Sequence, residues 1–219
     1  KKFNLGFPLN FLNIGGISNV TSTVDWKNLN HKLNDINAYD IGPGNCLIDE
    51  WIRKNSKKKY DKDGLIAKSG TIDELVLNQA LENFEENSNY KKSLDVRDFD
   101  IFFAKGLSLE NGAATITNFT AMLISNGMKY SHKMGKSIMY NWLVCGGGRK
   151  NKYLLESIKN TFEKINIQPI DEYEIDGDFV ESQAFGYLAI RSFLKLPISF
   201  PGTTGCKEPS NGGELVKNF

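Results

Sequence analysis

The chain has few of the features that commit a protein to a membrane or to nucleic acid. Among its 219 residues no apolar run approaches the roughly 20 residues that cross a bilayer. The N-terminus also lacks the hydrophobic segment of a signal peptide. The formal net charge is only +1, so no overall field attracts nucleic acid or an anionic membrane. We therefore expect neither of these as a partner.

Cysteine and histidine are also scarce. The three cysteines, Cys46, Cys145 and Cys206, form no CxxC pair and are odd in number. This argues against a zinc site and a disulfide framework, and it fits a reducing cytoplasm. His31 and His132 lie in polar segments and are interpreted as surface residues. Acid–base chemistry would therefore fall to carboxylates, and we expect no metal-ligating residue in this chain.

One acidic segment, Asp61-Lys62-Asp63-Gly64, is similar to part of a calcium loop. It lacks the third acidic ligand and the distal glutamate at the proper spacing. We interpret it as a charged turn.

Three glycine-rich turns, each after an apolar run, are the most informative feature that is present. They are Gly15-Gly16, Gly42-Pro43-Gly44 and Gly146-Gly147-Gly148, and Asp40 directly precedes the second. Glycine lets a backbone approach a ligand, and unpaired N–H groups at a helix start favour a phosphate. Taken singly, each could be a plain turn, and Asp40 an ordinary turn residue. Together they indicate a nucleotide held by backbone amides beside one acid that takes a proton.

The glycine spacing matches neither the dinucleotide-binding fingerprint nor the P-loop. The apolar periodicity predicts an α/β or mixed α+β fold with helices packed on a sheet. Strands are expected at residues 9–14, 19–26, 36–40, 138–144 and 167–170, the third of them ending at Asp40. Helices are expected at residues 46–52, 72–84, 108–125, 152–162 and 179–194. Loops are expected at 27–35 and 85–98, with irregular structure beyond residue 197.

The residues around these turns follow one another in a distinctive order. They are Leu12–Val20, Asp40–Asp49, Tyr60–Gly64 with Ala67 and Gly70, Val144–Gly148 with Asn151, Asp171–Tyr173 with Gly177-Asp178, and Glu181 with Ala184-Phe185. Across nearly the whole chain they resemble the C-terminal part of anhydro-N-acetylmuramic acid kinases. The resemblance implies an actin-like, sugar-kinase (ribonuclease H-like) fold of two lobes around a nucleotide cleft. Residues 1–195 would form the C-terminal lobe, and residues 196–219 a tail that returns toward the N-terminal lobe.

The resemblance also implies a reaction. Enzymes of this family use ATP and Mg²⁺ to open 1,6-anhydro-N-acetylmuramic acid with water and to phosphorylate its O6, giving N-acetylmuramic acid 6-phosphate during cell-wall recycling. In the family, the acid that matches Asp40 activates the water, and the glutamate that matches Glu181 contacts the sugar. Asn45 is assigned to the same substrate site. The nucleotide-binding residues would be Asn13, Gly15, Gly16 and Asn19 on the phosphate side, and Gly146, Gly147, Gly148 and Asn151 on the adenosine side.

The chain departs from the family pattern in two places. The first phosphate loop of the family, with the expected magnesium ligands, has no counterpart here. We therefore expect a fragment that lacks roughly 100–150 residues and is inactive alone. Further along, Lys92-Ser93-Leu94-Asp95 stands where the family usually has Lys-Ser-Thr-Gly, which predicts a different loop geometry.

Two other functions stay open. The chain could be a non-catalytic nucleotide-binding or interaction module of the actin-like fold, since one phosphate loop is missing. A kinase for an ordinary hexose fits less well, because hexose kinases share the fold but not the motif that begins at Asp40. The sequence also leaves open whether the protein forms a homodimer.

Overall fold

A single mixed sheet forms the centre of the molecule. The computed structural model describes residues 9–23, 36–85, 93–134, 141–162, 165–214 and 216. The strands are β1 (Leu9–Ile14), β2 (Ile17–Thr23), β3 (Ile36–Pro43), β4 (Asn141–Cys145) and β5 (Asn166–Pro169). Their order is β3-β2-β1-β4-β5. The pairs β1–β2 and β2–β3 are antiparallel, whereas β4 runs parallel to both β1 and β5. This is the arrangement of the ribonuclease H-like lobe that the resemblance implies, so the predicted fold class is confirmed.

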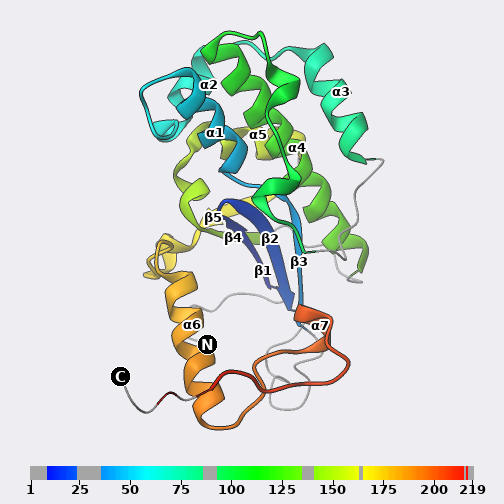
Figure 1. The fold of residues 1–219 in the computed structure, drawn as a ribbon, viewed down its shortest axis with the longest axis vertical. Coiled ribbons are helices and arrows are strands. Elements are labelled where there is room, and N and C mark those ends of the chain that lie inside the picture. The colour runs from blue at the N-terminus through cyan, green and yellow to red at the C-terminus, as the bar shows by residue number, and fades with distance from the viewer. Residues whose placement is uncertain are drawn as a thin grey trace.

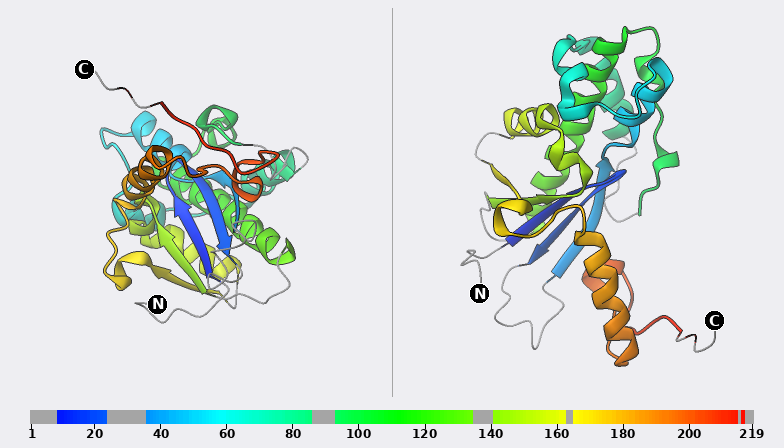
Figure 2. Two further views of the ribbon diagram at one scale, coloured as in Figure 1. Left: turned by 90° about the horizontal axis from the view of Figure 1, so that it is seen from below. Right: turned by 90° about the vertical axis from the view of Figure 1, so that its left-hand side faces the viewer.

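Helices lie on both sides of this sheet. They are α1 (Cys46–Asn55), α2 (Leu65–Ser69), α3 (Glu74–Glu85), α4 (Leu109–Met134), α5 (Lys152–Thr161), α6 (Val180–Phe193) and α7 (Pro201–Thr204). Short 3₁₀ turns occur at Lys62–Gly64, Val96–Asp98, Phe102–Ala104, Gly147–Lys150 and Ile170–Tyr173. Helices α1 to α5 lie to one side of the sheet, and α6 and α7 lie to the other (Figures 1 and 2).

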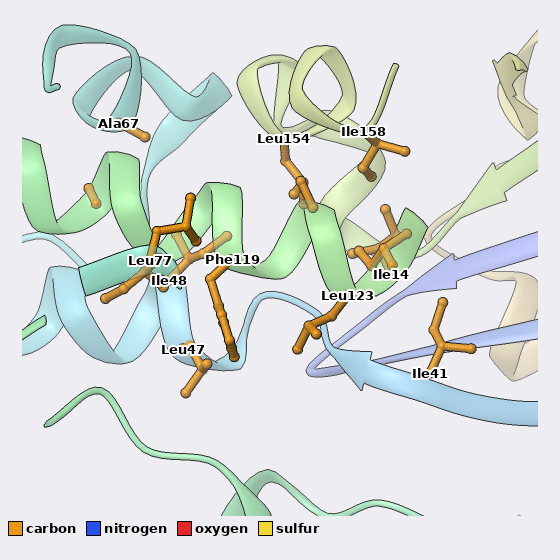
Figure 3. Close-up of a cluster of buried hydrophobic side chains, with 14 of the residues drawn as sticks. Ile14, Ile41, Leu47, Ile48, Ala67, Leu77, Phe119, Leu123, Leu154 and Ile158 are labelled. Carbon is orange, nitrogen blue, oxygen red and sulfur yellow. The ribbon is translucent and has the colours of Figure 1, made fainter. Parts of the chain in front are cut away.

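Most of the hydrophobic core lies between the sheet and α4. Leu12 and Ile14 of β1 are fully buried, and their neighbours in the strand are not, because alternate residues of a strand face opposite sides. Figure 3 shows Ile14 of the sheet between Leu123 of α4 and the buried residues Leu154 and Ile158 of α5. Asn13 lies on the opposite face of β1, which is only partly buried.

Several predicted bounds need correction. Strand β3 continues to Pro43, so Asp40 lies inside the strand rather than at its end. Helix α4 continues to Met134 instead of ending near residue 125, since apolar packing holds most of its length. The segment beyond residue 197 contains α7 and a β-bridge between Ser199 and Ser210, so it is not wholly irregular. The loop predicted at 27–35 lies outside the described residues.

Candidate active site

A row of polar residues crosses three neighbouring strands on the face opposite α4. Asn13 of β1 pairs with Asn19 of β2, and Asn19 pairs with Asp40 of β3. Directly paired residues of antiparallel strands point to the same face of a sheet. All three are partly exposed, whereas Leu12 and Val20 in the adjacent row are fully buried. The structure therefore brings together three residues that the sequence assigned to nucleotide and substrate.

The placement of Asp40 depends on an irregularity in β3. Ser18 pairs with Gly42 and Asn19 with Asp40, so Ile41 is an extra residue without a partner in β2. An extra residue of this kind is a β-bulge, which bends a strand and can re-aim the side chain beside it. Ile41 is fully buried, so the core anchors the bulge. The side chain next to this anchor is the carboxylate of Asp40.

The first two glycine turns are joined by their backbones. The N–H of Gly44 donates to the carbonyl of Gly16 at 2.8 Å, and the N–H of Asn45 donates to the carbonyl of Gly15 at 2.7 Å. A Cβ on Gly44 would lie 2.3 Å from the carbonyl oxygen of Gly15, closer than any side chain could sit. Glycine is therefore required here for close packing of the two turns.

The third glycine turn packs against the end of β1. Gly146 has a φ of +77°, and a Cβ on it would lie 2.4 Å from Oδ1 of Asn13. A Cβ on Gly147 would lie 3.6 Å from Nδ2 of Asn45, whose amide also lies 3.5 Å from the carbonyl of Ile14. The three turns thus lie together at one end of the sheet, as the sequence predicted. Gly147 opens a 3₁₀ turn, where the first N–H groups have no partner within the helix.

The amide of Asn151 has a structural task. Its Oδ1 accepts the N–H of Leu154 at 3.0 Å and so caps the N-terminus of α5. The residue is only 7% exposed. A Cβ on Gly64 would lie 2.2 Å from the same Oδ1, which shows how tightly the amide is enclosed. Asn151 therefore caps α5 directly after the third glycine turn, a role that an asparagine just before an expected helix signals but that was not assigned from the sequence.

Asp40 is held by a loop distant in the sequence. Its Oδ2 accepts the N–H of Leu94 at 2.8 Å and the hydroxyl of Ser93 at 3.3 Å. Among the described residues, no hydrogen bond reaches its other oxygen, Oδ1. The sequence pattern points to Asp40 but to neither donor, although Ser93 lies in the segment that departs from the family pattern.

The loop after Ser93 does not need the glycine that the family usually carries. Asp95 takes an extended conformation, with a φ of −116° and a ψ of 156°, which any residue can adopt. Its Oδ1 accepts the N–H of Arg97 at 3.0 Å, and its own N–H donates to Asp98 Oδ2 at 2.7 Å. This reciprocal capping box stabilises the 3₁₀ turn at 96–98. The prediction that the missing glycine changes the loop geometry finds no support in the backbone at Asp95.

Arg149, which was not considered from the sequence, holds the third glycine turn in place through hydrogen bonds. The side chain of Arg149 is 5% exposed and donates to both oxygens of Asp171, at 2.6 and 2.9 Å. It also donates to Oδ1 of Asp178 at 2.6 Å and to the carbonyl of Gly146 at 3.0 Å. The N–H of Gly146 in turn donates to the carbonyl of Gly177 at 3.2 Å. These contacts connect the turn after β4 to the segment that leads into α6.

The charges of this cluster shift its pKa values. Hydrogen bonds from Arg149 lower the pKa of Asp171 to about 2. They lower the pKa of Asp178 as well, with help from Lys150. Because an ionised carboxylate and a guanidinium form the strong bidentate pair, both aspartates stay charged at neutral pH. In the sequence, this ion-pair cluster is marked only by an arginine directly after the three glycines and by two aspartates seven residues apart. Both features are too common to predict that these side chains pair.

Glu181 lies in the first turn of α6 and is exposed. Burial raises the pKa of the nearby Cys145 thiol to about 11, and the charge of Glu181 contributes a smaller increase. The side chain of Glu181 makes no hydrogen bond to Asp40.

The described residues offer no metal centre and no membrane span. No group of three or more histidine, cysteine or acidic side chains among them is placed to hold a metal ion. Asp61 uses both its oxygens, at 2.9 Å each, to accept the N–H groups of Ile66 and Ala67. Asp61 is thereby buried at the start of α2, where it binds backbone N–H groups. No helix in the described part of the chain is long and apolar enough to cross a membrane.

The sheet order and the clustered glycine turns define a lobe of the ribonuclease H-like class. Residues 8–218 match the profile of the family described as anhydro-N-acetylmuramic acid kinase. The chain belongs to this family.

Proteins with this family name from three bacteria show the extent of the match. The one from Pelagibacter ubique is 49% identical over 214 residues, which are 97% of this chain and 56% of the relative. Those from Zymomonas mobilis and Agrobacterium fabrum are 36% and 37% identical, and the matches cover 95% and 96% of this chain and 54% of each relative. The chain thus spans about half the length of the curated relatives that it matches.

Among solved structures, this fold is similar to an activator of 2-hydroxyisocaproyl-CoA dehydratase from Clostridium difficile with bound ADPNP. The TM-score is 0.48 at 13% sequence identity, and the match covers 81% of this chain and 58% of that one.

Proposed function

We propose that this chain forms the C-terminal lobe of an ATP-dependent kinase that opens 1,6-anhydro-N-acetylmuramic acid and phosphorylates O6. The observation that supports the proposal is the row of Asn13, Asn19 and Asp40 beside three glycine turns. A single carboxylate next to backbone that can approach phosphates is what a coupled hydrolysis and phosphoryl transfer needs. Membership of the family supplies the identity of the sugar.

Asp40 is the proposed general base. It takes a proton from a water molecule, and the water oxygen bonds to the anomeric carbon of the sugar. The bond between this carbon and the bridging oxygen breaks, and the bridging oxygen becomes O6. O6 then attacks the γ-phosphorus of ATP, and ADP leaves. Asn45 and Glu181 are assigned to the sugar.

The proposed nucleotide lies along the joined glycine turns. Gly15 and Gly16, with Asn13 and Asn19, would face its phosphates. The turn that starts at Gly146 would face the adenosine. When bound, Mg²⁺ would neutralise charge on the phosphates. The described residues include no carboxylate cluster to hold it, so we assign no step to the metal and expect its ligands in another part of the protein.

We also propose that α6 and the tail from residue 196 face an N-terminal lobe. No residue of α6 is buried, and Phe185, Ile190 and Phe193 are each at least 60% exposed. Apolar patches of this kind usually mark a contact surface. The relatives are nearly twice as long as the matched region, so they contain a further domain that could cover this helix. The tail itself turns back to β3, where Gly202 packs on the carbonyl of Ile36.

The test uses a fusion in which the N-terminal region of the Pelagibacter ubique relative precedes this chain. With ATP, Mg²⁺ and the anhydrosugar in ¹⁸O-water, the fusion should give a 6-phosphate that carries ¹⁸O at the anomeric position. Asp40→Asn should reduce turnover by about 10²–10⁴ while ATP still binds. Glu50→Gln, which alters only a surface pair with Lys54, is the control. A folded fusion that binds ATP but makes no product would favour the alternative, a non-catalytic nucleotide-binding module.

A further inference from the structure

The loop from Ser93 to Phe99 touches three parts of the candidate site. Ser93 and Leu94 donate to Asp40, as described above. The side chain of Val96 lies over the first glycine turn, since a Cβ on Gly16 would be 3.6 Å from its Cγ1. Phe99 stacks on Phe84 of α3, with ring centroids 5.9 Å apart. The loop is therefore anchored in the helical layer at one end and reaches the carboxylate at the other.

We infer that Ser93, together with the backbone N–H of Leu94, is the positioning element that fixes the carboxylate of Asp40 for proton transfer. Both donors converge on Oδ2, so rotation of the carboxylate about its Cβ–Cγ bond would break both hydrogen bonds. Oδ1 is then the oxygen that remains to accept the proton of the attacking water. This inference rests on the proposed function, because it assigns a role to the contacts of the proposed base.

The geometry explains why one loop should carry both donors. Asp40 sits beside the bulge at Ile41, so its backbone is set by the core. Its side chain is only partly buried and could otherwise adopt several rotamers. The capping box of Asp95 and Asp98 holds the following turn rigid. A rigid loop thus restricts the carboxylate to the orientation that the chemistry needs, and a small misplacement of a catalytic group can reduce rate by about a hundredfold.

The inference predicts a specific kinetic pattern in the fusion protein described above. Ser93→Ala should lower kcat by about ten- to a hundredfold and leave the KM for ATP unchanged, because only the fixed orientation of the Asp40 carboxylate is lost. Ser93→Thr keeps a hydroxyl and should restore kcat to within about threefold of the wild type. Ser69→Ala is the matched control, since its hydroxyl donates to the carbonyl of Ile66 in α2, far from Asp40 in the sequence.

A thermal double-mutant cycle tests the contact itself. If Ser93 and Asp40 interact, the losses in Tm from Ser93→Ala and Asp40→Ala should not add in the double variant. Additive losses, or a kcat for Ser93→Ala equal to that of the wild type, would overturn the inference while the kinase proposal stands. A folded wild-type fusion without turnover would instead overturn the proposed function, and the inference with it.

Discussion

Gly127 of α4 makes room for Ile41, the bulged residue directly after Asp40. A Cβ on Gly127 would lie 2.4 Å from the Cβ of Ile41 and 2.5 Å from its Cγ2. Figure 3 shows Ile41 beside the part of α4 that carries Leu123. The helix also accepts a hydrogen bond at this position, since the hydroxyl of Tyr39 donates to the carbonyl of Gly127 at 3.2 Å. The core on one face of β3 therefore sets the position of the carboxylate on the other.

Gly127→Ala should for this reason damage both stability and catalysis. The added methyl group has to displace Ile41, and such overpacking costs about 1–3 kcal/mol of the free energy of unfolding. Movement of the bulge would also misplace Asp40 and lower kcat in the fusion protein. Urea unfolding and turnover assays measure the two effects.

Gly186→Ala in α6 provides the control for the stability effect, measured on this chain without an N-terminal lobe. Nothing lies within 4 Å of a Cβ at Gly186, so alanine should be neutral or stabilise the helix by about 0.5–1 kcal/mol. If Gly127→Ala and Gly186→Ala changed the free energy of unfolding by the same amount, the proposed contact between Gly127 and Ile41 would be contradicted.

Gly44→Ala should separate the two glycine turns that lie at the ends of β1 and β3. Its Cβ would meet the backbone carbonyl of Gly15, which cannot rotate away as a side chain would. We expect a loss of about 1–3 kcal/mol or more in the free energy of unfolding. Gly16→Ala is the matched comparison, because its Cβ would meet only the side chain of Val96 at an ordinary 3.6 Å. A loss for Gly16→Ala as large as that for Gly44→Ala would show that the turns do not pack as described.

Local patterns in the sequence predicted much of the fold and part of the candidate site. The apolar run at residues 9–14 predicted strand β1 with the bounds that the structure shows. The glycines marked places where backbones approach closely. Their order also gave the correct expectation that three separate turns meet, and the family resemblance singled out Asp40.

What the sequence could not give are contacts that only the tertiary structure creates. The bulge at Ile41 depends on its fit against Gly127, 86 positions away. The donors of Asp40 come from a loop more than 50 residues further along. A pattern that spans a few residues contains no information about either pairing. The same holds for Arg149, whose partner Asp171 lies 22 residues away.

The Asp171 carboxylate should make the stability of this chain depend on acid pH. Its pKa is lowered from 3.8 to about 2 in the folded state by hydrogen bonds from Arg149. A depressed folded pKa means that the stabilisation is present above pH 3.8 and is lost as the pH falls toward 2. The difference in free energy of unfolding between wild type and Asp171→Asn should therefore shrink over this range. Glu208→Gln at an exposed site of the tail is the control, and an unchanged difference from pH 5 to pH 2 would contradict the assignment.

Arg149 should tolerate neither lysine nor alanine. Lysine keeps the charge but loses the planar fork that binds both oxygens of Asp171 while it reaches Asp178. We expect a loss of about 1–3 kcal/mol in the free energy of unfolding for Arg149→Lys, since a charged group is left without some of its hydrogen bonds. Arg149→Ala should cost at least as much, about 1–3 kcal/mol or more, because it removes all of these hydrogen bonds while the carboxylates of Asp171 and Asp178 stay partly exposed to water.

The comparison for these variants is Arg97→Ala. The side chain of Arg97 is 93% exposed and lies 3.9 Å from Asp95, so the loss should stay below about 1 kcal/mol. Hydrogen exchange adds a local measurement. The N–H of Gly146, which donates to the carbonyl of Gly177, should exchange faster in both Arg149 variants, because the arginine no longer ties the turn to the segment before α6. If the N–H of Gly146 still exchanged at the wild-type rate, Arg149 would stabilise the fold without holding the third glycine turn in place.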